Sequence, residues 1–170
     1  GAMNAIVSSE ETDLVKLKAL LAKVPSVEGL ELSSTVTTGK SYTYGDPASA
    51  LHVAVIDLGV KENTLRCLAD RGCYVKVFPM NTSFEEMEKF NPQGYMVSNG
   101  PGDPAAMPAM VDTVKKILNS DKALMGICLG HQLLAEACGI KTFKMFNGHR
   151  GINHPVKNMV TGRAEVTSQN

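Results

Sequence analysis

The chain has 170 residues, enough for one domain with a buried core, and its 44% of hydrophobic residues is ordinary for a soluble protein. Its net charge of zero argues against binding to nucleic acid or to an anionic membrane, and no apolar run approaches membrane-spanning length. The four cysteines show no Cys-x-x-Cys spacing, which argues against a zinc site and a secreted disulfide scaffold. We therefore expect a reducing, cytoplasmic location.

The first fifty residues differ in pattern from the rest of the chain. Residues 1–3, Gly-Ala-Met, are interpreted as a remnant of cloning. Leucines at helical spacing then predict a short helix that ends at Pro25. The stretch 26–47 is rich in Ser, Thr, Gly and Tyr, with a short alternating piece around 32–37. We predict that residues 4–50 are a connector from another domain, and that the part after the helix is a solvated linker.

Short apolar runs alternate with amphipathic segments from residue 51 onward. The expected strands are 53–56, 74–78, 94–97 and 123–127, and the expected helices are 61–71, a short one from Ser83, 107–118 and 132–138. This alternation predicts an α/β fold in which a mostly parallel sheet carries helices on both faces, with flavodoxin-like layering. Beyond Gly139 the sequence indicates a strand over 141–146, a polar, turn-rich segment and a hairpin within 156–169. We assign residues 51–170 to this domain.

One heptapeptide lies between the last expected strand and the helix that follows it. Residues 126–132 read Gly-Ile-Cys-Leu-Gly-His-Gln, which predicts that Cys128 occupies a sharp strand-to-helix turn. Such a turn is the thiol counterpart of the Gly-x-Ser-x-Gly nucleophile elbow, and the helix N-terminus favours the thiolate. The N–H of Leu129 would then point to where a tetrahedral oxyanion forms. By itself the pattern also fits a small, buried, inert cysteine.

A second informative loop follows the third expected strand. Residues 98–104 read Ser-Asn-Gly-Pro-Gly-Asp-Pro, and the glycines at 100 and 102 let the backbone approach a ligand closely. Taken alone, the loop also fits an ordinary β-to-α turn. In parallel sheets, however, ligands bind at the carboxyl ends of the strands, where both this loop and Cys128 are expected. The two segments together predict one site at that edge.

The heptapeptide closely resembles the nucleophile motif of class I, triad-type glutamine amidotransferases, which release ammonia from glutamine through a cysteine thioester. The loop at 98–104 resembles the oxyanion loop of that family. The resemblance implies that Cys128 is the nucleophile and that the N–H groups of Gly100 and Leu129 hold the oxyanion. The residues that it implies for glutamine binding are Gly100, Gly102, Leu129, Gln132 and, from the tail described next, Asn170. It implies no metal and no cofactor on this chain.

The C-terminal segment resembles one subfamily. Residues 147–156, Asn-Gly-His-Arg-Gly-Ile-Asn-His-Pro-Val, and 167–170, Thr-Ser-Gln-Asn, resemble the small, glutamine-hydrolysing subunit of carbamoyl phosphate synthetase. The stretch 4–50 also resembles the connector of that subunit. The implied partners are L-glutamine and a large synthetase subunit, with no nucleic acid and no membrane. That partner would use ATP and Mg²⁺ to make carbamoyl phosphate from bicarbonate and ammonia.

One component of the family pattern is missing. The family's base is a histidine oriented by a glutamate in a C-terminal His-x-Glu segment, and no His-x-Glu occurs in this sequence. A substrate-binding serine of the family's N-terminal domain is missing as well. We expect His131 to be structural and His52 to play no part, whereas His149 and His154 could face the site or brace the polar loop. We therefore interpret the chain as a fragment with weak or no glutaminase activity.

Three other functions fit parts of the sequence. The chain could be a class I amidotransferase that feeds ammonia to a different synthetase. It could be a non-catalytic interaction module in which Cys128 is vestigial. It could also be a cysteine hydrolase of the related intracellular-peptidase type, although the segments at 98–104 and 147–156 argue against that.

Overall fold

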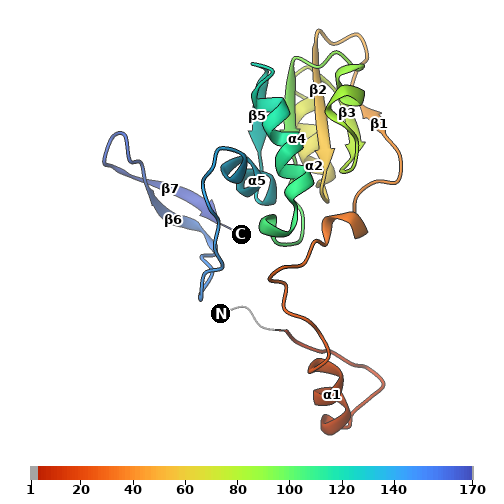
Figure 1. Ribbon diagram of the computed structural model, residues 1–170, viewed down its shortest axis with the longest axis vertical. Helices are drawn as coiled ribbons and strands as arrows, with labels where there is room; N and C mark the ends of the chain where they lie inside the picture. The colour runs from red at the N-terminus through yellow and green to blue at the C-terminus, as the bar shows by residue number, and fades with distance from the viewer. Residues whose placement is uncertain (1–3, 170) are drawn as a thin grey trace. The chain divides into compact units, whose positions relative to one another are not determined.

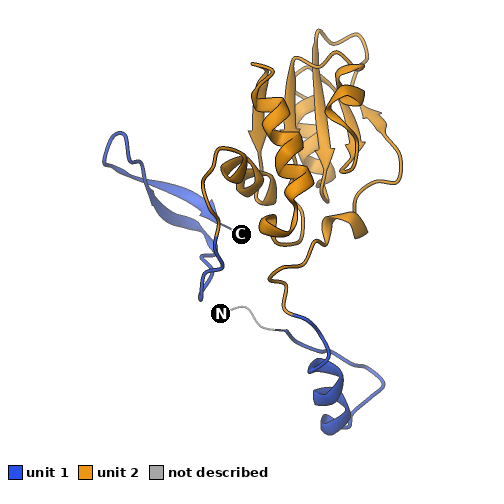
Figure 2. Ribbon diagram, viewed as in Figure 1, with its two compact units in different colours: residues 1–25, 143–170 blue, residues 26–142 orange. Residues whose placement is uncertain are grey.

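The computed structural model describes residues 4–169 and divides into two compact units (Figure 2). One unit comprises residues 26–142, and the other comprises the two ends of the chain, up to residue 25 and from residue 143 onward. Residues 1–3, interpreted as a cloning remnant, and Asn170, predicted to contact glutamine, lie outside the described residues.

A five-stranded sheet forms the centre of the unit 26–142 (Figure 1). Its strands are β1 (Tyr42–Tyr44), β2 (Leu51–Asp57), β3 (Cys73–Pro79), β4 (Gly94–Val97) and β5 (Ala123–Gly126), in the order β1-β3-β2-β4-β5. The four predicted strands are confirmed, and they run parallel to one another. The short antiparallel edge strand β1 was not predicted. Since successive strands lie on opposite sides of β2, the carboxyl ends of β2 and β4 form the switch point where such sheets bind ligands.

The first three helices of this unit begin within one residue of their predicted positions, and the fourth begins at Leu129, three residues before the predicted start. They are α2 (Glu62–Ala69), α3 (Phe84–Glu88), α4 (Pro108–Leu118) and α5 (Leu129–Ala137), with short 3₁₀ turns η1 (Ser33–Thr35) and η2 (Pro104–Ala106). The capping spacing noted at Ser83 is confirmed, because its hydroxyl accepts from the N–H of Glu86 and so stabilises the start of α3. Among the described residues, no helix is both long enough and apolar enough to cross a bilayer.

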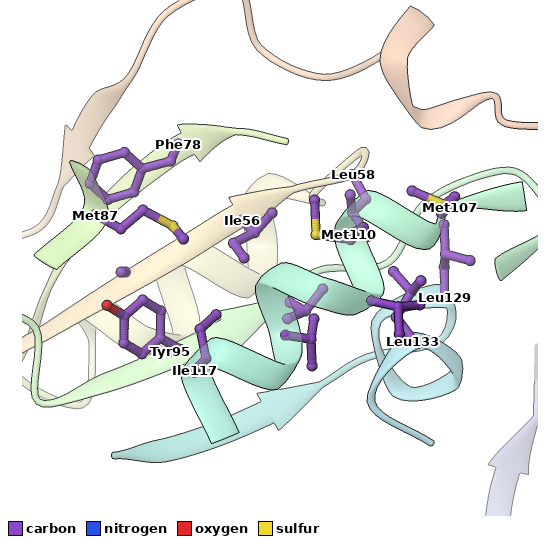
Figure 3. Packing of buried hydrophobic residues seen from close by; sticks show 14 residues of the cluster. Ile56, Leu58, Phe78, Met87, Tyr95, Met107, Met110, Ile117, Leu129 and Leu133 are labelled. Atoms are coloured by element: carbon purple, nitrogen blue, oxygen red, sulfur yellow. The ribbon is translucent and has the colours of Figure 1, made fainter. Parts of the chain in front are cut away.

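Two clusters of buried side chains cover the two faces of the sheet. On one face, Ile56 and Tyr95 pack against side chains of α4 and α5 (Figure 3). On the other face, Val55, Val77 and Met96 pack against Leu65 of α2. Burial of one large apolar side chain, such as valine, leucine, isoleucine or methionine, contributes about 1.5–3 kcal/mol to the free energy of folding. The predicted fold class, a mostly parallel sheet with helices on both faces, is confirmed.

The other unit contains a helix and a hairpin. Helix α1 (Leu14–Leu21) is confirmed and is capped by Asp13, whose side chain accepts from the N–H of Val15. Strands β6 (Gly151–Lys157) and β7 (Ala164–Gln169) form an antiparallel pair.

The hairpin begins earlier than predicted, inside the segment expected to be irregular. The strand expected at 141–146 is wrong: this stretch is irregular, and Phe143 and Phe146 are exposed. Among the described residues no other strand pairs with it, so its backbone groups lack the ladder that a strand requires.

The segment after α1 differs from the solvated linker that was predicted. Ser33 is fully buried, and the hydroxyl of Thr37 donates to the carbonyl oxygen of Asp57 at the end of β2. The piece around 32–37 forms the 3₁₀ turn η1 and not a strand. The role of residues 4–50 as a connector from a further domain stays a prediction.

Candidate active site

Cys128 lies in the turn between β5 and α5. Its backbone has φ 53° and ψ −112°, a left-handed conformation that is strained for any residue with a Cβ. The residue is exposed, so its thiol is not part of the apolar core. The structure thus has the sharp, outward turn expected from the heptapeptide. Strain of this kind costs on the order of 1–3 kcal/mol and is concentrated at functional sites.

The glycines on either side of Cys128 are required by close backbone contacts. A Cβ on Gly126 would lie 2.5 Å from the carbonyl oxygen of Gly130, and one on Gly130 would lie 2.1 Å from that of Val97. The N–H of Gly130 also donates to the carbonyl oxygen of Ser98 at 3.2 Å. The elbow is therefore packed directly against the end of β4, where the 98–104 loop begins.

The 98–104 loop is in turn fixed to the end of β2. Ser98 is fully buried, and its hydroxyl oxygen accepts from the N–H of Leu58 at 2.9 Å. The side-chain amide of Asn99 donates to the carbonyl oxygen of Gly59 at 2.8 Å. A Cβ on Gly100 would lie 2.1 Å from the carbonyl oxygen of Leu58, so only glycine fits this approach. The structure thus brings the two sequence-predicted segments together at the switch point of the sheet.

One N–H group on the elbow and one on the 98–104 loop are free to bind an oxygen. Among residues 4–169, the N–H groups of Gly100 and Leu129 have no hydrogen-bond acceptor in the protein. For Leu129 this follows from its place in the first turn of α5, where N–H groups have no partner within the helix. Such groups, together with the helix dipole, favour negative charge. An exposed thiol with unpaired donors on neighbouring loops suits the formation of a tetrahedral oxyanion.

Comparison with known families shows to which family a chain with this arrangement belongs. Residues 54–170 match the family described as "Glutamine amidotransferase class-I". The chain belongs to this family. The matched range begins within β2 and includes the 98–104 loop, Cys128 and the β6–β7 hairpin. The family resemblance read from the heptapeptide and the loop is therefore confirmed.

Several similar curated proteins share one name. The chain is 45% identical to the carbamoyl phosphate synthase small chain of Chlorobaculum tepidum, covering 100% of this chain and 47% of that protein. It is 44% identical to the one from Nostoc sp., again with 100% and 47% coverage. For Salmonella typhimurium the identity is 42%, with 100% and 49% coverage. The amidotransferase chain thus spans about half the length of the curated relatives it matches.

A solved structure supports the fold. The crystal structure of a putative GMP synthase protein from Thermoplasma acidophilum superposes with a TM-score of 0.52, at 23% identity over 61% of this chain and 52% of that one. At this identity the likeness shows the amidotransferase fold alone.

The predicted glutamine contact Gln132 and His131, which was expected to be structural, lie on α5. Gln132 is exposed and lies in the first turn of α5, four residues after Cys128. The N–H of Gln132 donates to the carbonyl oxygen of Cys128 at 3.1 Å. His131 is also exposed, and no hydrogen bond of its ring occurs within the described part of the chain.

The remaining histidines have contacts of their own. His52 lies at the start of β2, the end of the strand remote from the switch point, with its ring 5.0 Å from that of Phe90. His149 and His154 lie within 143–169, with ring centroids 5.3 Å apart. The Nε2 atom of His154 lies 2.7 Å from the carbonyl oxygen of Arg150, so this ring braces its own polar segment.

Asp57 was missed by the sequence reasoning, although it directly follows a buried strand at the switch point. The residue is 5% exposed, and its carboxylate accepts from three backbone N–H groups, those of Thr38, Gly59 and Val60. An acidic residue at the carboxyl end of a strand was the available signal. Among residues 4–169, no group of three or more His, Cys, Asp or Glu side chains is arranged to hold a metal ion.

Proposed function

We propose that the chain is the glutamine-hydrolysing part of a carbamoyl phosphate synthetase small subunit. One observation carries the proposal: Cys128 is exposed at φ 53° on an elbow that is hydrogen-bonded to the 98–104 loop. The identity of 45% over the whole chain to a carbamoyl phosphate synthase small chain supports the subfamily. Because the chain spans about half of that relative, the activity of the whole protein is part of the proposal.

The proposed chemistry begins with attack of the Cys128 thiolate on the carboxamide carbon of glutamine. A carbon–sulfur bond forms, and the carbonyl oxygen becomes a negatively charged oxyanion. The carbon–nitrogen bond then breaks, the nitrogen takes up a proton, and ammonia leaves. Water hydrolyses the remaining glutamyl thioester, which releases glutamate and restores the thiol.

The backbone donors described above have a defined part in this scheme. The N–H groups of Gly100 and Leu129 would stabilise the oxyanion, and loss of one such donor typically costs about 10²–10³ in rate. Gly102 and Gln132 would contact the bound glutamine together with Gly100 and Leu129. Asn170 is proposed to contact glutamine as well, by its resemblance to the family. No metal or cofactor on this chain takes part in the proposed scheme.

The ammonia would pass to a large synthetase subunit. That partner would combine it with bicarbonate, using ATP and Mg²⁺, to give carbamoyl phosphate. The words "small chain" in the name of the relatives support a partner of this kind. A cytoplasmic location is also proposed, and it is supported by the four free cysteines among the described residues.

Turnover by these 170 residues alone should be weak. No His-x-Glu occurs in the sequence, so the histidine that the family uses as its base has no counterpart here. Without a base, protonation of the leaving nitrogen and activation of the hydrolytic water are both unassisted, which typically costs about 10²–10⁴ in rate. Glutamate release near the median enzyme rate of about 10 s⁻¹ would show that another residue serves as the base.

Labelling with 6-diazo-5-oxo-norleucine, a glutamine analogue that alkylates nucleophilic thiols, tests the proposed function. We expect Cys128 to be modified faster than Cys67 and Cys138, which are also exposed, and L-glutamine to protect it. The Cys128→Ser variant should show no protectable labelling. If the three cysteines react equally and glutamine protects none of them, the chain is a non-catalytic module.

The partner requires a separate experiment. The chain would be immobilised and exposed to the purified large subunit of carbamoyl phosphate synthetase, with the glutamine-hydrolysing component of a GMP synthetase as the matched control. Retention of the large subunit on the chain but not on the control would support the subfamily. Equal retention on both, or on neither, would instead favour an amidotransferase of another synthetase.

A further inference from the structure

Residues 29–38, here called the strap, run along the 98–104 loop. Glu31 forms an antiparallel bridge with Gly102. The N–H of Asp103 donates to the carbonyl oxygen of Leu30 at 2.9 Å, and the N–H of Gly29 donates to the carboxylate of Asp103 at 2.8 Å. A segment that precedes the whole sheet in sequence therefore makes strand-like contacts with a loop near the candidate nucleophile.

A buried hydroxyl joins the centre of the strap to the centre of the loop. The side chain of Ser33 is fully buried and donates to the carbonyl oxygen of Pro101 at 2.8 Å. Pro101 lies between the two glycines that approach the site. Pro101 itself is exposed and the bond is partly buried, so the buried Ser33 hydroxyl holds this carbonyl in one direction and restricts how the loop can rotate. The next residue, Ser34, is exposed, and its hydroxyl makes no hydrogen bond within the described residues.

The far end of the strap is tied to the turn after β2. Thr38 donates its N–H to one carboxylate oxygen of Asp57 at 2.7 Å. The other oxygen accepts from the N–H groups of Gly59 and Val60, both at 2.8 Å. This is the turn against which Gly100 packs. The loop is thus enclosed by the strap on one side and by a turn that the strap also holds on the other.

The strap also explains why residue 102 is glycine. Its φ is 116°, and an added Cβ would lie 3.0 Å from both the carbonyl oxygen of Leu30 and the N–H nitrogen of Leu32. The absence of a side chain is therefore required by the strap itself. Contact with substrate is not needed to account for this residue.

We propose that the strap positions the 98–104 loop so that the N–H of Gly100 faces the oxyanion, and that Ser33 and Asp57 are positioning residues. This inference rests on the proposed function, because it presumes that an oxyanion forms at Cys128. Neither residue touches the reacting atoms. Ser33 acts through Pro101, and Asp57 acts through the turn at Gly59.

The test compares Ser33→Ala with Ser34→Ala, which removes an exposed hydroxyl one residue away. The probe is the analogue of glutamine in which an aldehyde replaces the carboxamide. The thiol of Cys128 adds across its carbonyl to give a thiohemiacetal, with the thiol proton transferred to oxygen or released to solvent. That oxygen occupies the oxyanion position, so the dissociation constant reports the placement of the donors. Alkylation of Cys128 by iodoacetamide, which forms no oxyanion, reports the thiol alone.

We expect Ser33→Ala to raise the dissociation constant of the aldehyde at least about tenfold. The effect should stay below that of losing a whole oxyanion donor, because the donor is displaced and not removed. The rate at which iodoacetamide alkylates Cys128 in Ser33→Ala should stay within about twofold of the parent rate, because this reaction forms no oxyanion for the loop to stabilise. Ser34→Ala should change neither quantity. Unchanged aldehyde binding in Ser33→Ala, or an equal loss in both assays, would overturn the inference. Trypsin leaves Cys128 and Cys138 in one peptide, 123–141. All variants therefore also carry Cys138→Ser, so that alkylation of this peptide reports Cys128 alone.

Hydrogen exchange separates this inference from the proposed function. If the parent chain does not bind the aldehyde, glutamine hydrolysis at Cys128 is contradicted, and exchange at Asp103 then decides whether the strap orders the loop. The N–H of Asp103 is bonded to the strap, so Ser33→Ala should speed its exchange about tenfold relative to Ser34→Ala. Equal exchange in the two variants would show that Ser33 does not hold the loop.

Discussion

The N–H of Gly130 donates to the carbonyl oxygen of Ser98 at 3.2 Å, although the two residues lie on segments that follow different strands. The bond joins the first turn of α5 to the start of the 98–104 loop. It forms because neither Gly126 nor Gly130 has a side chain to hold the backbones apart. Together with the bond from the N–H of Ile127 to the carbonyl oxygen of Val97 at 3.0 Å, this contact fixes the elbow that carries the candidate nucleophile to the start of the loop that carries one candidate oxyanion donor.

Replacement of Gly130 by alanine tests this contact. The added Cβ would lie 2.1 Å from the carbonyl oxygen of Val97, so the start of α5 must move. We expect Gly130→Ala to lower the free energy of unfolding by about 3 kcal/mol, at the upper end of typical overpacking costs. Urea unfolding measures the effect. Gly39→Ala is the matched control, since a Cβ there meets nothing within 4 Å, and its stability should be close to that of the parent.

The strained backbone of Cys128 predicts a difference in stability between two replacements of this residue. Glycine adopts φ 53° without strain, whereas alanine retains the Cβ that causes it. We therefore expect Cys128→Gly to be about 1 kcal/mol more stable than Cys128→Ala. Glycine removes the backbone strain, and its larger conformational entropy in the unfolded chain offsets part of this gain. Thermal unfolding of the two variants gives the comparison. Equal stability would mean that the turn relaxes around any side chain.

Asp57 should be among the more costly carboxylates to remove. It is 5% exposed and accepts from three backbone N–H groups, which Asp57→Ala would leave unpaired. We expect a loss of about 2–4 kcal/mol in the free energy of unfolding, because buried donors without partners are expensive. Asp46→Ala is the control. That aspartate is exposed and caps a single N–H, that of Ala48, so its loss should cost less than about 1 kcal/mol.

A carboxylate at the opposite end of the sheet predicts how stability depends on pH. Partial burial opposes ionisation of Glu88, but hydrogen bonds from Lys122 and Tyr95 outweigh it and lower the pKa of Glu88 below its ordinary value of 4.5. A lowered pKa in the folded state adds stability above the unfolded pKa, and this is lost as the pH falls through the folded pKa. The parent should therefore exceed Glu88→Gln in stability at neutral pH and converge with it below about pH 4.5.

Urea unfolding between pH 2.5 and 7 would follow this convergence. Glu86→Gln is the control, because the pair that Glu86 forms with Lys89 is largely exposed and such pairs contribute little. Burial, followed by the charge and hydrogen bond of Glu88, raises the pKa of Tyr95 above its ordinary value of 10.0. The hydroxyl of Tyr95 therefore stays protonated as the donor to Glu88 throughout this range. A constant gap between the parent and Glu88→Gln would contradict the role given to Glu88.

The sequence revealed those parts of the fold that have a strong hydrophobic period. The run 53–56 and the stripe of Met107 and Met110 were read correctly because burial selects apolar side chains at fixed spacing. Strand β1 was missed because three residues of an edge strand need few apolar side chains. The strand expected at 141–146 is absent because pairing with a second strand, which local sequence does not encode, is missing among the described residues.

In the candidate site, too, some residues were predicted from the sequence and others were missed. Cys128 and the 98–104 loop were predicted because glycines at such spacing are rarely needed except where backbones approach closely. Ser33 and Thr38 were assigned to a solvated linker, since a serine or threonine bonded to water and one bonded to a distant carbonyl look alike in sequence. Only the long-range partners, such as Pro101 for Ser33, distinguish the two.

The strap has a practical consequence for recombinant work on the family. The match to class-I glutamine amidotransferases begins at residue 54, downstream of every residue of the strap. A version trimmed to that boundary would keep the thiol and the parallel strands β3, β4 and β5 but would leave the carbonyl of Pro101 without its donor. Weaker binding of the glutamine aldehyde by such a shortened protein than by the 170-residue chain would then reflect a misplaced boundary and not an unreactive cysteine.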